Sequence, residues 1–497
     1  MTLAFQTMNA IPHGPDYVSI LPEIVLSLFG LLIMMLDPVM DERRSQRTLG
    51  GIALIGSILA LLATVYQGHY LAQTGFPGLA FWNMVKIDAF SIFFHFVVAL
   101  VTILVILASY EYMEVQQIRA GEYYGLLLFG AVGMALMSSA VELVLTFIAL
   151  EISSIATYIL AGFRRRSAIS AESSLKYFLL GSFATSFFLY GVALMFGATG
   201  STSISAIADS MARYANGGHG PLLAYLGVAF MFVGLGFKVA AAPFHVWTPD
   251  VYEGAPSPVV AFMSTAPKAA VFAVLLRIMF QTHAPGRIWL IWAAAALSMT
   301  IGNIAALVQD NVKRLLAYSS IAHAGYLLVA FASLPENGIP AAMFYAASYA
   351  VMNVGAFAVV GHFASHGERY VTIEDYAGLG KRSPLLAAVF TMFLLSLIGI
   401  PMFGGFFAKF YVFSAALQSD LVGLVIIGVL NSAVAAYYYL RIIVVMYMRE
   451  PREEVPVAPV PAGLGFALTL SLALTIYLGV LPNRVLEYAH QSVELLK

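Results

Sequence analysis

The sequence contains no cysteine and few charged residues. Because none of its 497 residues is Cys, this chain offers no thiolate for an iron–sulfur cluster, no disulfide and no cysteine nucleophile. Only 10% of the residues are charged, whereas an ordinary soluble domain has about 25%. The formal net charge is -1, so the composition gives no reason to expect a nucleic-acid partner.

The sequence also lacks the motifs of redox and nucleotide chemistry. It has no glycine-rich dinucleotide fingerprint after a strand, no Walker A loop and no cluster with metal-ligand spacing. The energy for any transport must therefore come from an ion gradient or from partner subunits. The N-terminal stretch has no basic region and no small-residue cleavage site, so we expect the first apolar helix to be an uncleaved span.

Long apolar runs make up most of the chain. Hydrophobic residues account for 61% of the sequence, and each run is close to the roughly 20 residues that cross a bilayer as a helix. We therefore predict an all-α polytopic membrane protein of about 14 transmembrane helices. The predicted spans are 19–36, 48–67, 89–110, 123–140, 142–162, 174–198, 222–243, 256–280, 287–307, 315–333, 340–363, 384–417 (broken), 421–446 and 462–481.

Basic residues test this count, because they concentrate in cytoplasmic loops. Fifteen fall in odd-numbered loops: Arg43, Arg44, Arg47, Arg119, Arg164, Arg165, Arg166, Lys176, Lys313, Arg314, Arg369, Lys381, Arg382, Arg449 and Arg452. Three fall in even-numbered loops: Lys86, Arg213 and Arg287. A miscounted helix would mix the two groups, so we predict that both termini face away from the cytoplasm.

Arg484 and Lys497 lie in the C-terminal tail, so five of the 25 basic residues remain within the predicted spans. Arg277 and Arg441 lie near span ends, where a long side chain can extend to the interface. Lys238, Lys268 and Lys409 lie deeper, and Glu151 is the acidic residue in mid-span.

A charge near the bilayer centre costs about 2.5–3.5 kcal/mol on insertion scales, and such residues usually mark an ion or proton pathway. Buried ion pairs that fix helix packing are the alternative, but three lysines cannot all be neutralised by one glutamate. Burial disfavours the charged form of a lysine and a nearby carboxylate favours it. A movement of Glu151 relative to Lys238 would therefore switch the lysine between holding and releasing a proton.

Each of these lysines lies beside a predicted helix break. Pro243 follows Lys238, Pro267 immediately precedes Lys268, and GIPMFGGFFAK leads into Lys409. Interrupted helices at membrane depth are tolerated only inside protein or beside a watered cavity. A single proline would indicate a simple kink, whereas three coincidences of break and lysine indicate a proton path.

Histidines are secondary candidates. His245 lies seven residues after Lys238 and would share its face if the helix were continuous. His323, within SSIAHAGYLL, has an unperturbed pKa that suits a proton relay, although a lone helical histidine is more often a packing residue. His95 and His362 are weaker candidates.

Four segments carry a resemblance to a known family. FIALEISSIATYILAGF, SSLKYFLLGSFATSFFLYG, GFKVAAAPFHVWTPDVYEGAPSPVVAFMSTAPKAAVF and GIPMFGGFFAKFYVF resemble the antiporter-like membrane subunits of respiratory complex I, above all the subunit N family of bacterial NADH–quinone oxidoreductases. The resemblance covers essentially the whole chain. The lysine at position 409 differs from the glutamate of one sister subunit, and the long lateral helix of the largest sister is missing.

The resemblance implies a fold, a set of site residues and partners. It implies two inverted five-helix repeats with broken helices, at 123–282 and 283–450, between three N-terminal helices within 1–122 and a last helix and tail at 451–497. Glu151 and Lys238 would form a coupled pair, Lys268 and His323 a central relay, and Lys409 the terminal proton site; His245 belongs to the path.

The resemblance also implies that this chain holds no cofactor. FMN, iron–sulfur clusters and quinone are expected in partner subunits, which include the sister antiporter-like subunits in a bacterial inner membrane.

Other functions remain open. The chain resembles, more distantly, subunits of multi-subunit Na⁺/H⁺ antiporters and membrane-bound hydrogenases, and a free-standing secondary transporter is a further alternative. The charged loop 364–383 is either a docking surface for a partner or simply solvated.

Overall fold

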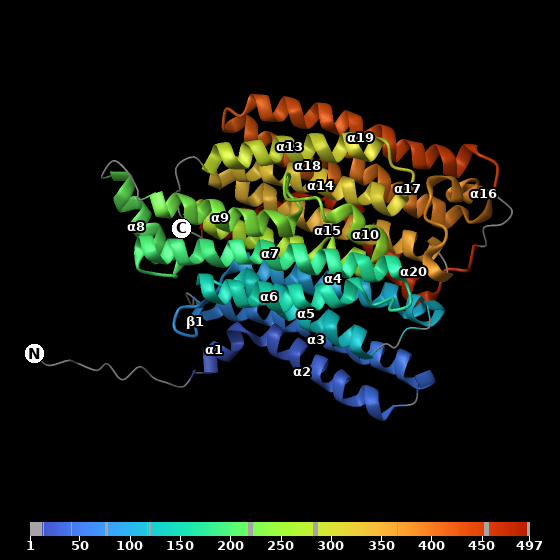
Figure 1. The fold of residues 1–497 in the computed structure, drawn as a ribbon, viewed down its shortest axis with the longest axis horizontal. Coiled ribbons are helices and arrows are strands. Elements are labelled where there is room, and N and C mark those ends of the chain that lie inside the picture. Colours follow the sequence, from blue (N-terminus) through green and yellow to red (C-terminus); the bar gives the residue numbers. More distant parts are fainter. Residues whose placement is uncertain are drawn as a thin grey trace, which may run out of the picture.

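A computed structural model describes residues 12, 14–40, 42–74, 78–116, 118, 121–216, 222–281, 287–364, 366–451 and 457–494. Long helices run side by side along the longest dimension of the molecule (Figure 1). Each of the 14 predicted spans falls on a helix or on a pair of consecutive helices, so the predicted fold class is confirmed. Twelve helical spans in the described part of the chain, one of them formed by α11 (Ser257–Met263) and α12 (Ala266–Gln281) together, are long and apolar enough to cross a membrane.

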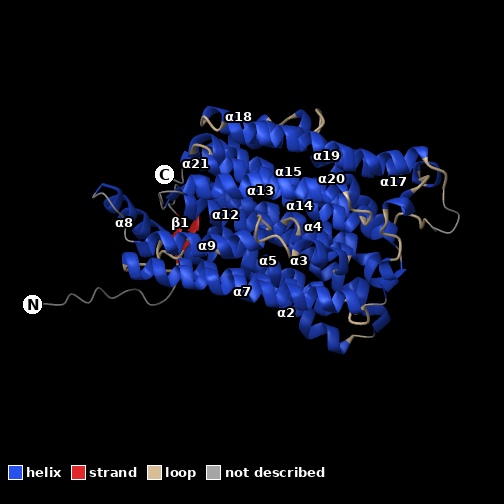
Figure 2. Ribbon diagram, turned by 45° about the horizontal axis from the view of Figure 1, so that its top comes forward, coloured by secondary structure: helices blue, strands red, loops and turns tan. Residues whose placement is uncertain are grey.

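The N-terminal part contains three long helices and a small hairpin. Its elements are α1 (Gly14–Ser19), α2 (Leu21–Leu36), η1 (Asp37–Val39), α3 (Glu42–Thr74), β1 (Gly78–Ala80), β2 (Val85–Ile87) and α4 (Ala89–Gln116). The antiparallel strands pair Leu79 with Lys86, and they are the only strands in the described part of the chain (Figure 2).

The next group of helices contains the first interruption. Its elements are α5 (Gly121–Ser139), α6 (Leu143–Ala161), α7 (Ala168–Thr199), α8 (Ile204–Asn216), α9 (Leu222–Val239), α10 (Thr248–Gly254), α11 (Ser257–Met263) and α12 (Ala266–Gln281). The chain leaves helical geometry after α9 and resumes it in α10. A second interruption, at Ser264 and Thr265, separates α11 from α12.

The C-terminal half contains a comparable interruption. Its elements are α13 (Arg287–Leu307), α14 (Val312–Ala332), α15 (Pro335–Ala364), η2 (His366–Glu368), η3 (Ile373–Tyr376), α16 (Leu379–Arg382), α17 (Pro384–Ile398), α18 (Gly404–Gln418), α19 (Val422–Met448), α20 (Ala462–Val480) and α21 (Asn483–Glu494). Gly399 ends α17 with a φ of 95°. Glycine adopts this left-handed conformation without the strain that a side chain would cause.

Burial divides the helices into a centre and a periphery. In the 18-residue apolar stretch of the α11–α12 span every residue is buried, and in those of α14 and α15 94% of the residues are buried, whereas in those of the outer helices α2 and α7 only 28% and 39% are. Large apolar side chains such as Leu175, Phe183 and Tyr190 are exposed along α7, as expected for a lipid-facing helix. The most buried helices carry Lys268 and His323, so those two residues lie at the centre of the protein.

One end of the bundle carries α1, the β1–β2 hairpin and α8, and the opposite end carries α16 (Figure 1). Helix α21, the last described element, lies at the hairpin end (Figure 2). The described chain therefore starts and finishes at the same end, as an even number of spans requires.

The expectation that Arg277 extends to the interface is wrong. Its side chain is fully buried, and Nη2 lies 2.9 Å from Oδ1 and 3.1 Å from Oδ2 of Asp88, the residue before α4. Arg441 does reach a more exposed position, where its Nη2 lies 2.6 Å from Asp310. The contrast arises because α12 is enclosed on all sides, so its C-terminal half has no route to water.

Candidate functional site

The first lysine of the predicted path lies among aromatic rings. Lys238, one residue before the end of α9, is buried, and its Nζ donates to the Tyr158 hydroxyl on α6 at 2.8 Å. The same ammonium lies 4.4 Å from the Tyr158 ring centroid and 5.2 Å from that of Tyr177, which favours a cation–π interaction. Sequence reasoning missed Tyr158, although its spacing of seven from Glu151 places both on one face of α6.

Glu151 and Lys238 are electrostatically coupled without direct contact. The Glu151 charge acts on Lys238, but no ion pair joins them, and Oε1 of Glu151 is buried with no hydrogen-bond partner among the described residues. Tyr158 contacts Lys238 directly and lies two helical turns after Glu151 on α6.

The interruption after Lys238 is satisfied by polar groups of the protein. Trp247 Nε1 donates to the carbonyl of Phe237 at 2.9 Å, and the backbone N–H of Ala242 donates to Ser298 Oγ on α13 at 2.8 Å. Since α9 ends at Val239, His245 does not share a helix face with Lys238, and the condition for that expectation is not met. His245 is half-buried, and its Nδ1 has no partner among the described residues.

The second lysine contacts a serine and, through it, a tyrosine. Lys268 on α12 donates to Ser320 Oγ at 2.6 Å and to the Ser320 carbonyl at 3.2 Å. The Tyr349 hydroxyl on α15 donates to the same Oγ at 2.7 Å. Lys268 and His323 line one small cavity, so the structure brings together the two residues predicted to be neighbours.

The third lysine lies at the interruption between α17 and α18. Lys409 on α18 donates to the free carbonyl of Ile398 at the end of α17 at 2.8 Å. Its Nζ lies 4.7 Å from the centroid of the Tyr326 ring, and the His323 ring lies 5.7 Å from the same ring on its edge. Tyr326 therefore contacts both His323 and Lys409, and the His323 Nδ1 contacts the Tyr345 hydroxyl at 2.7 Å.

Tyr252 lies between the first and second lysine centres. Its ring contacts Trp247, which stacks on Tyr177 beside Lys238. Its buried hydroxyl lies near the Ser320 hydroxyl but makes no hydrogen bond of good geometry with any described residue.

Sequence reasoning missed the tyrosines near the lysines, because an aromatic residue in an apolar helix is ordinarily interpreted as part of the hydrophobic core. Only the spacing of Tyr345, Tyr349 and Asn353 on α15, four residues apart, indicates a polar stripe.

A cluster of charges at the α16 end was also missed. The carboxylate of Glu368 in η2 contacts Lys313 at 2.8 Å and Arg164 at 2.7 Å, and it accepts from the Ser257 N–H and from the Tyr112 hydroxyl. Burial by itself raises the pKa of Glu368, but the two cations and the donated hydrogen bonds hold that pKa below its ordinary value.

The Glu368 cluster joins loops and helices that lie far apart in the sequence. In the charged loop 364–383, Glu368 is thus a buried anchor, neither solvated nor available to a partner.

The other candidate histidines lie away from the lysines. His362 Nδ1 lies 3.6 Å from Glu111, and its Nε2 contacts the Ala458 carbonyl at 3.1 Å. His95 lies beside Glu23 in the N-terminal helices. Among the described residues there is no group of three or more His, Cys, Asp or Glu side chains that would hold a metal ion.

Comparisons with known proteins identify the family of the chain. Residues 140–435 match the family model described as NADH:quinone oxidoreductase/Mrp antiporter, TM. The chain is 65% identical to NADH-quinone oxidoreductase subunit N 2 of Koribacter versatilis over 482 residues, which cover 96% of this chain and 97% of the relative. It is 51% identical to subunit N 1 of Solibacter usitatus over 486 residues, with 97% and 98% coverage.

A solved structure supports the same grouping. A chain of respiratory complex I from Thermus thermophilus with bound aureothin is 36% identical, with a TM-score of 0.78 and coverage of 94% of this chain and 98% of that chain. The protein is thus an antiporter-like, multi-pass membrane protein. It belongs to the subunit N family of the NADH–quinone oxidoreductases.

Proposed function

We propose that this chain is the proton-translocating membrane subunit of an NADH–quinone oxidoreductase, and that Glu151, Lys238, Lys268, His323 and Lys409 carry the protons. One observation supports this most directly. The three buried lysines form no ion pair with any described residue; they donate to hydroxyls and backbone carbonyls instead.

The kind of partner decides what a buried lysine does. A carboxylate within hydrogen-bond distance would stabilise the ammonium and keep the proton in place. A hydroxyl accepts from an ammonium and donates to a neutral amine, so the lysine keeps a partner in both protonation states. Tyr158 and Ser320 are hydroxyl partners of this kind for Lys238 and Lys268.

Glu151 sets the first step. With Glu151 ionised, its field favours the ammonium of Lys238; once Glu151 is protonated or moves away, burial favours release. The released proton passes towards Lys268 past Tyr252, and from the Lys268–His323 cavity past Tyr326 to Lys409. His245, beside the first interruption, supplies a further protonatable group on this path.

The redox chemistry belongs to partner subunits under this proposal. FMN, iron–sulfur clusters and quinone lie there, and the sister antiporter-like subunits pack against this chain in the bacterial inner membrane. The chain consists of helices within 1–122, two inverted repeats at 123–282 and 283–450, and a last helix and tail at 451–497, with both termini on the non-cytoplasmic side. The identities of the curated relatives favour this assignment over an Na⁺/H⁺ antiporter or hydrogenase subunit and over a free-standing transporter.

Two experiments test the proposal. Purification of the tagged chain in mild detergent should recover flavin- and iron–sulfur-containing subunits, and a chain that purifies alone would overturn the assignment. In the assembled complex, Lys238→Ala or Glu151→Ala should reduce quinone reduction by NADH while NADH oxidation by an artificial acceptor continues.

The matched control is Lys381→Ala, which removes an exposed lysine in α16. Equal quinone reductase activity in all three variants and the unsubstituted complex would remove Glu151 and Lys238 from the mechanism.

A further inference from the structure

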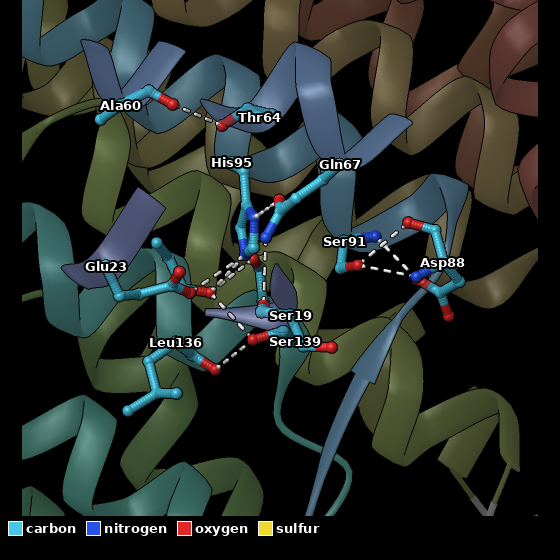
Figure 3. A network of polar contacts seen from close by, with 12 residues as sticks. Ser19, Glu23, Ala60, Thr64, Gln67, Asp88, Ser91, His95, Leu136 and Ser139 are labelled. Atoms are coloured by element: carbon cyan, nitrogen blue, oxygen red, sulfur yellow. Dashed lines mark hydrogen bonds and ion pairs between the residues drawn. The ribbon is translucent and has the colours of Figure 1, made fainter. Parts of the chain in front are cut away.

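A second pair of titratable groups lies outside the lysine path. Glu23 on α2 and His95 on α4 are buried, with exposed fractions of 5% and 2%. Oε1 of Glu23 lies 3.4 Å from Nε2 of His95. Figure 3 shows the two side chains pointing towards each other, with Gln67 of α3 on the other edge of the imidazole ring.

Gln67 fixes the proton on one nitrogen of His95. Its Nε2 donates to the carbonyls of Val18 at 2.8 Å and Ser19 at 3.1 Å, so the orientation of the amide is determined. Its Oε1 therefore faces His95 Nδ1, at 3.2 Å. Because Oε1 accepts only, His95 Nδ1 must carry a hydrogen.

The other ring nitrogen faces two oxygens. His95 Nε2 lies 3.0 Å from the Ala135 carbonyl on α5 and 3.4 Å from Glu23 Oε1. If Glu23 is ionised, both neighbours are acceptors, so Nε2 also carries a hydrogen and the ring is an imidazolium. If Glu23 is neutral, its O–H donates to the lone pair of Nε2. The ionised arrangement satisfies both ring nitrogens and the Ala135 carbonyl, whereas the neutral arrangement leaves that carbonyl facing a lone pair.

Among the described residues, His95 is the only polar side chain that faces the Glu23 carboxyl group. Neither carboxylate oxygen has a hydrogen bond from a described residue, and a buried carboxylate without donors is costly unless a cation compensates it. The other charges that act on His95 are Asp88, just before α4, and Arg277 on α12. Those two charges pair with each other and largely cancel, and Lys86 lies 3.7 Å from Asp88.

A small pocket adjoins this pair. It is lined by Ser19, Gln67, Tyr70, Leu71 and Gly78, among others, so it shares two residues with the network and reaches the β1 strand. Gln67, which contacts His95 Nδ1, therefore also lines a pocket at the hairpin end of the bundle.

We propose that Glu23 and His95 form a proton-binding dyad that exchanges its proton with the hairpin end of the protein. In the exchange within the dyad, the proton leaves Glu23 Oε1 for the lone pair of His95 Nε2, the neutral carboxyl becomes a carboxylate, and the imidazole becomes an imidazolium. The net charge of the pair stays at zero. Uptake of one further proton by Glu23 then gives a pair of charge +1, which returns that proton to the pocket.

The dyad is independent of the lysine path, and only its contribution to pumping rests on the proposed function. Arg277 provides the physical link, because α12 carries both Arg277, paired with Asp88 at the start of α4, and Lys268. A change in the charge of the dyad acts through this ion pair on the helix that holds the central lysine.

Infrared difference spectroscopy of the assembled complex, between a low and a high pH, tests the dyad. Glu23→Gln should remove one protonated-carboxyl band, and His95→Gln should shift that same band, because the two groups share a proton. Glu23→Asp should restore a band. The matched control is Glu111→Gln, since Glu111 also faces a histidine, but it is 33% exposed.

The results separate the two proposals. A carboxyl band that His95→Gln leaves unchanged, or that Glu23→Gln leaves in place, would overturn the dyad. The pH profile of proton translocation should also shift by at least half a pH unit in Glu23→Gln and return in Glu23→Asp, whereas coinciding profiles would refute exchange during turnover. If Lys238→Ala leaves pumping intact while the band behaves as expected, the proposed function fails and the dyad stands.

Discussion

Ser320→Ala is the most informative single substitution near the centre of the path. It removes an oxygen that lies 2.6 Å from Lys268 Nζ and 2.7 Å from the Tyr349 hydroxyl. A hydrogen bond to a charged group contributes about 1.5–3 kcal/mol and a neutral one about 0.5–1.5 kcal/mol. The Ser320 carbonyl stays 3.2 Å from Lys268 Nζ and compensates in part for the lost oxygen. We therefore expect a loss of interaction free energy near the lower end of the two ranges combined, about 2 kcal/mol.

This loss of interaction free energy should lower the rate of proton translocation. A change of about 1.4 kcal/mol in an activation free energy changes a rate about tenfold, so proton translocation coupled to NADH oxidation should fall at least tenfold in proteoliposomes. Ser319→Ala is the matched control, because that serine precedes Ser320 on α14 and contacts Tyr439 instead of a lysine. Its effect on translocation should be small.

A double-mutant cycle completes this test. Once Lys268→Met has removed the ammonium, Ser320→Ala should have little further effect, so the two substitutions should be strongly non-additive. Additivity within about 0.5 kcal/mol, or equal losses in the Ser319 and Ser320 variants, would show that Ser320 acts through packing and would refute the reasoning.

Three further substitutions test the surrounding structure. Glu368→Gln should cost about 3–5 kcal/mol, because it leaves buried cations uncompensated, and it should lower the melting temperature of the complex; an unchanged melting curve would contradict this. Since the pKa of Glu368 is lowered in the folded protein, its stabilisation is present above an unfolded-state pKa of about 4.3 and is lost as the pH falls through the folded value; melting curves of the unsubstituted complex and Glu368→Gln should therefore converge in acid. Tyr252→Phe should slow translocation and change stability by less than about 0.5 kcal/mol, because its hydroxyl has no described partner to lose; a large stability loss with normal translocation would assign it to packing. Asp88→Asn should destabilise the protein by about 3–5 kcal/mol because Arg277 is then unpaired, whereas a neutral effect on thermal unfolding would show that water reaches the guanidinium.

The helices and the mid-span lysines were predictable from the sequence, because the bilayer imposes both signals locally. A span needs its own apolar residues, and a charged residue inside one is conspicuous without any knowledge of its neighbours. Lys238, Lys268 and Lys409 are all buried, each beside an interruption.

The partners of these lysines were not predictable, because they come from distant parts of the chain. Ser320 is 52 residues from Lys268, and Tyr158 is 80 residues from Lys238. A serine or tyrosine in an apolar helix carries no local sign that its hydroxyl faces an ammonium.

The burial of Arg277 and Glu368 was also not predictable from the sequence. Arg277 and Glu368 occupy positions in the sequence that favour exposure, one near the end of an apolar run and the other in a charged loop. Both are buried because their partners, Asp88 at a separation of 189 residues and Lys313 at 55, lie where only the tertiary fold places them.

The ratio of protons translocated to NADH oxidised, measured in proteoliposomes containing the assembled complex, tests the central claim most directly. If Lys238 is a site that protons occupy during turnover, Lys238→Ala should lower this ratio or abolish turnover, and Lys381→Ala should leave it unchanged. An assembled Lys238→Ala complex with the full ratio and the full turnover would contradict the account.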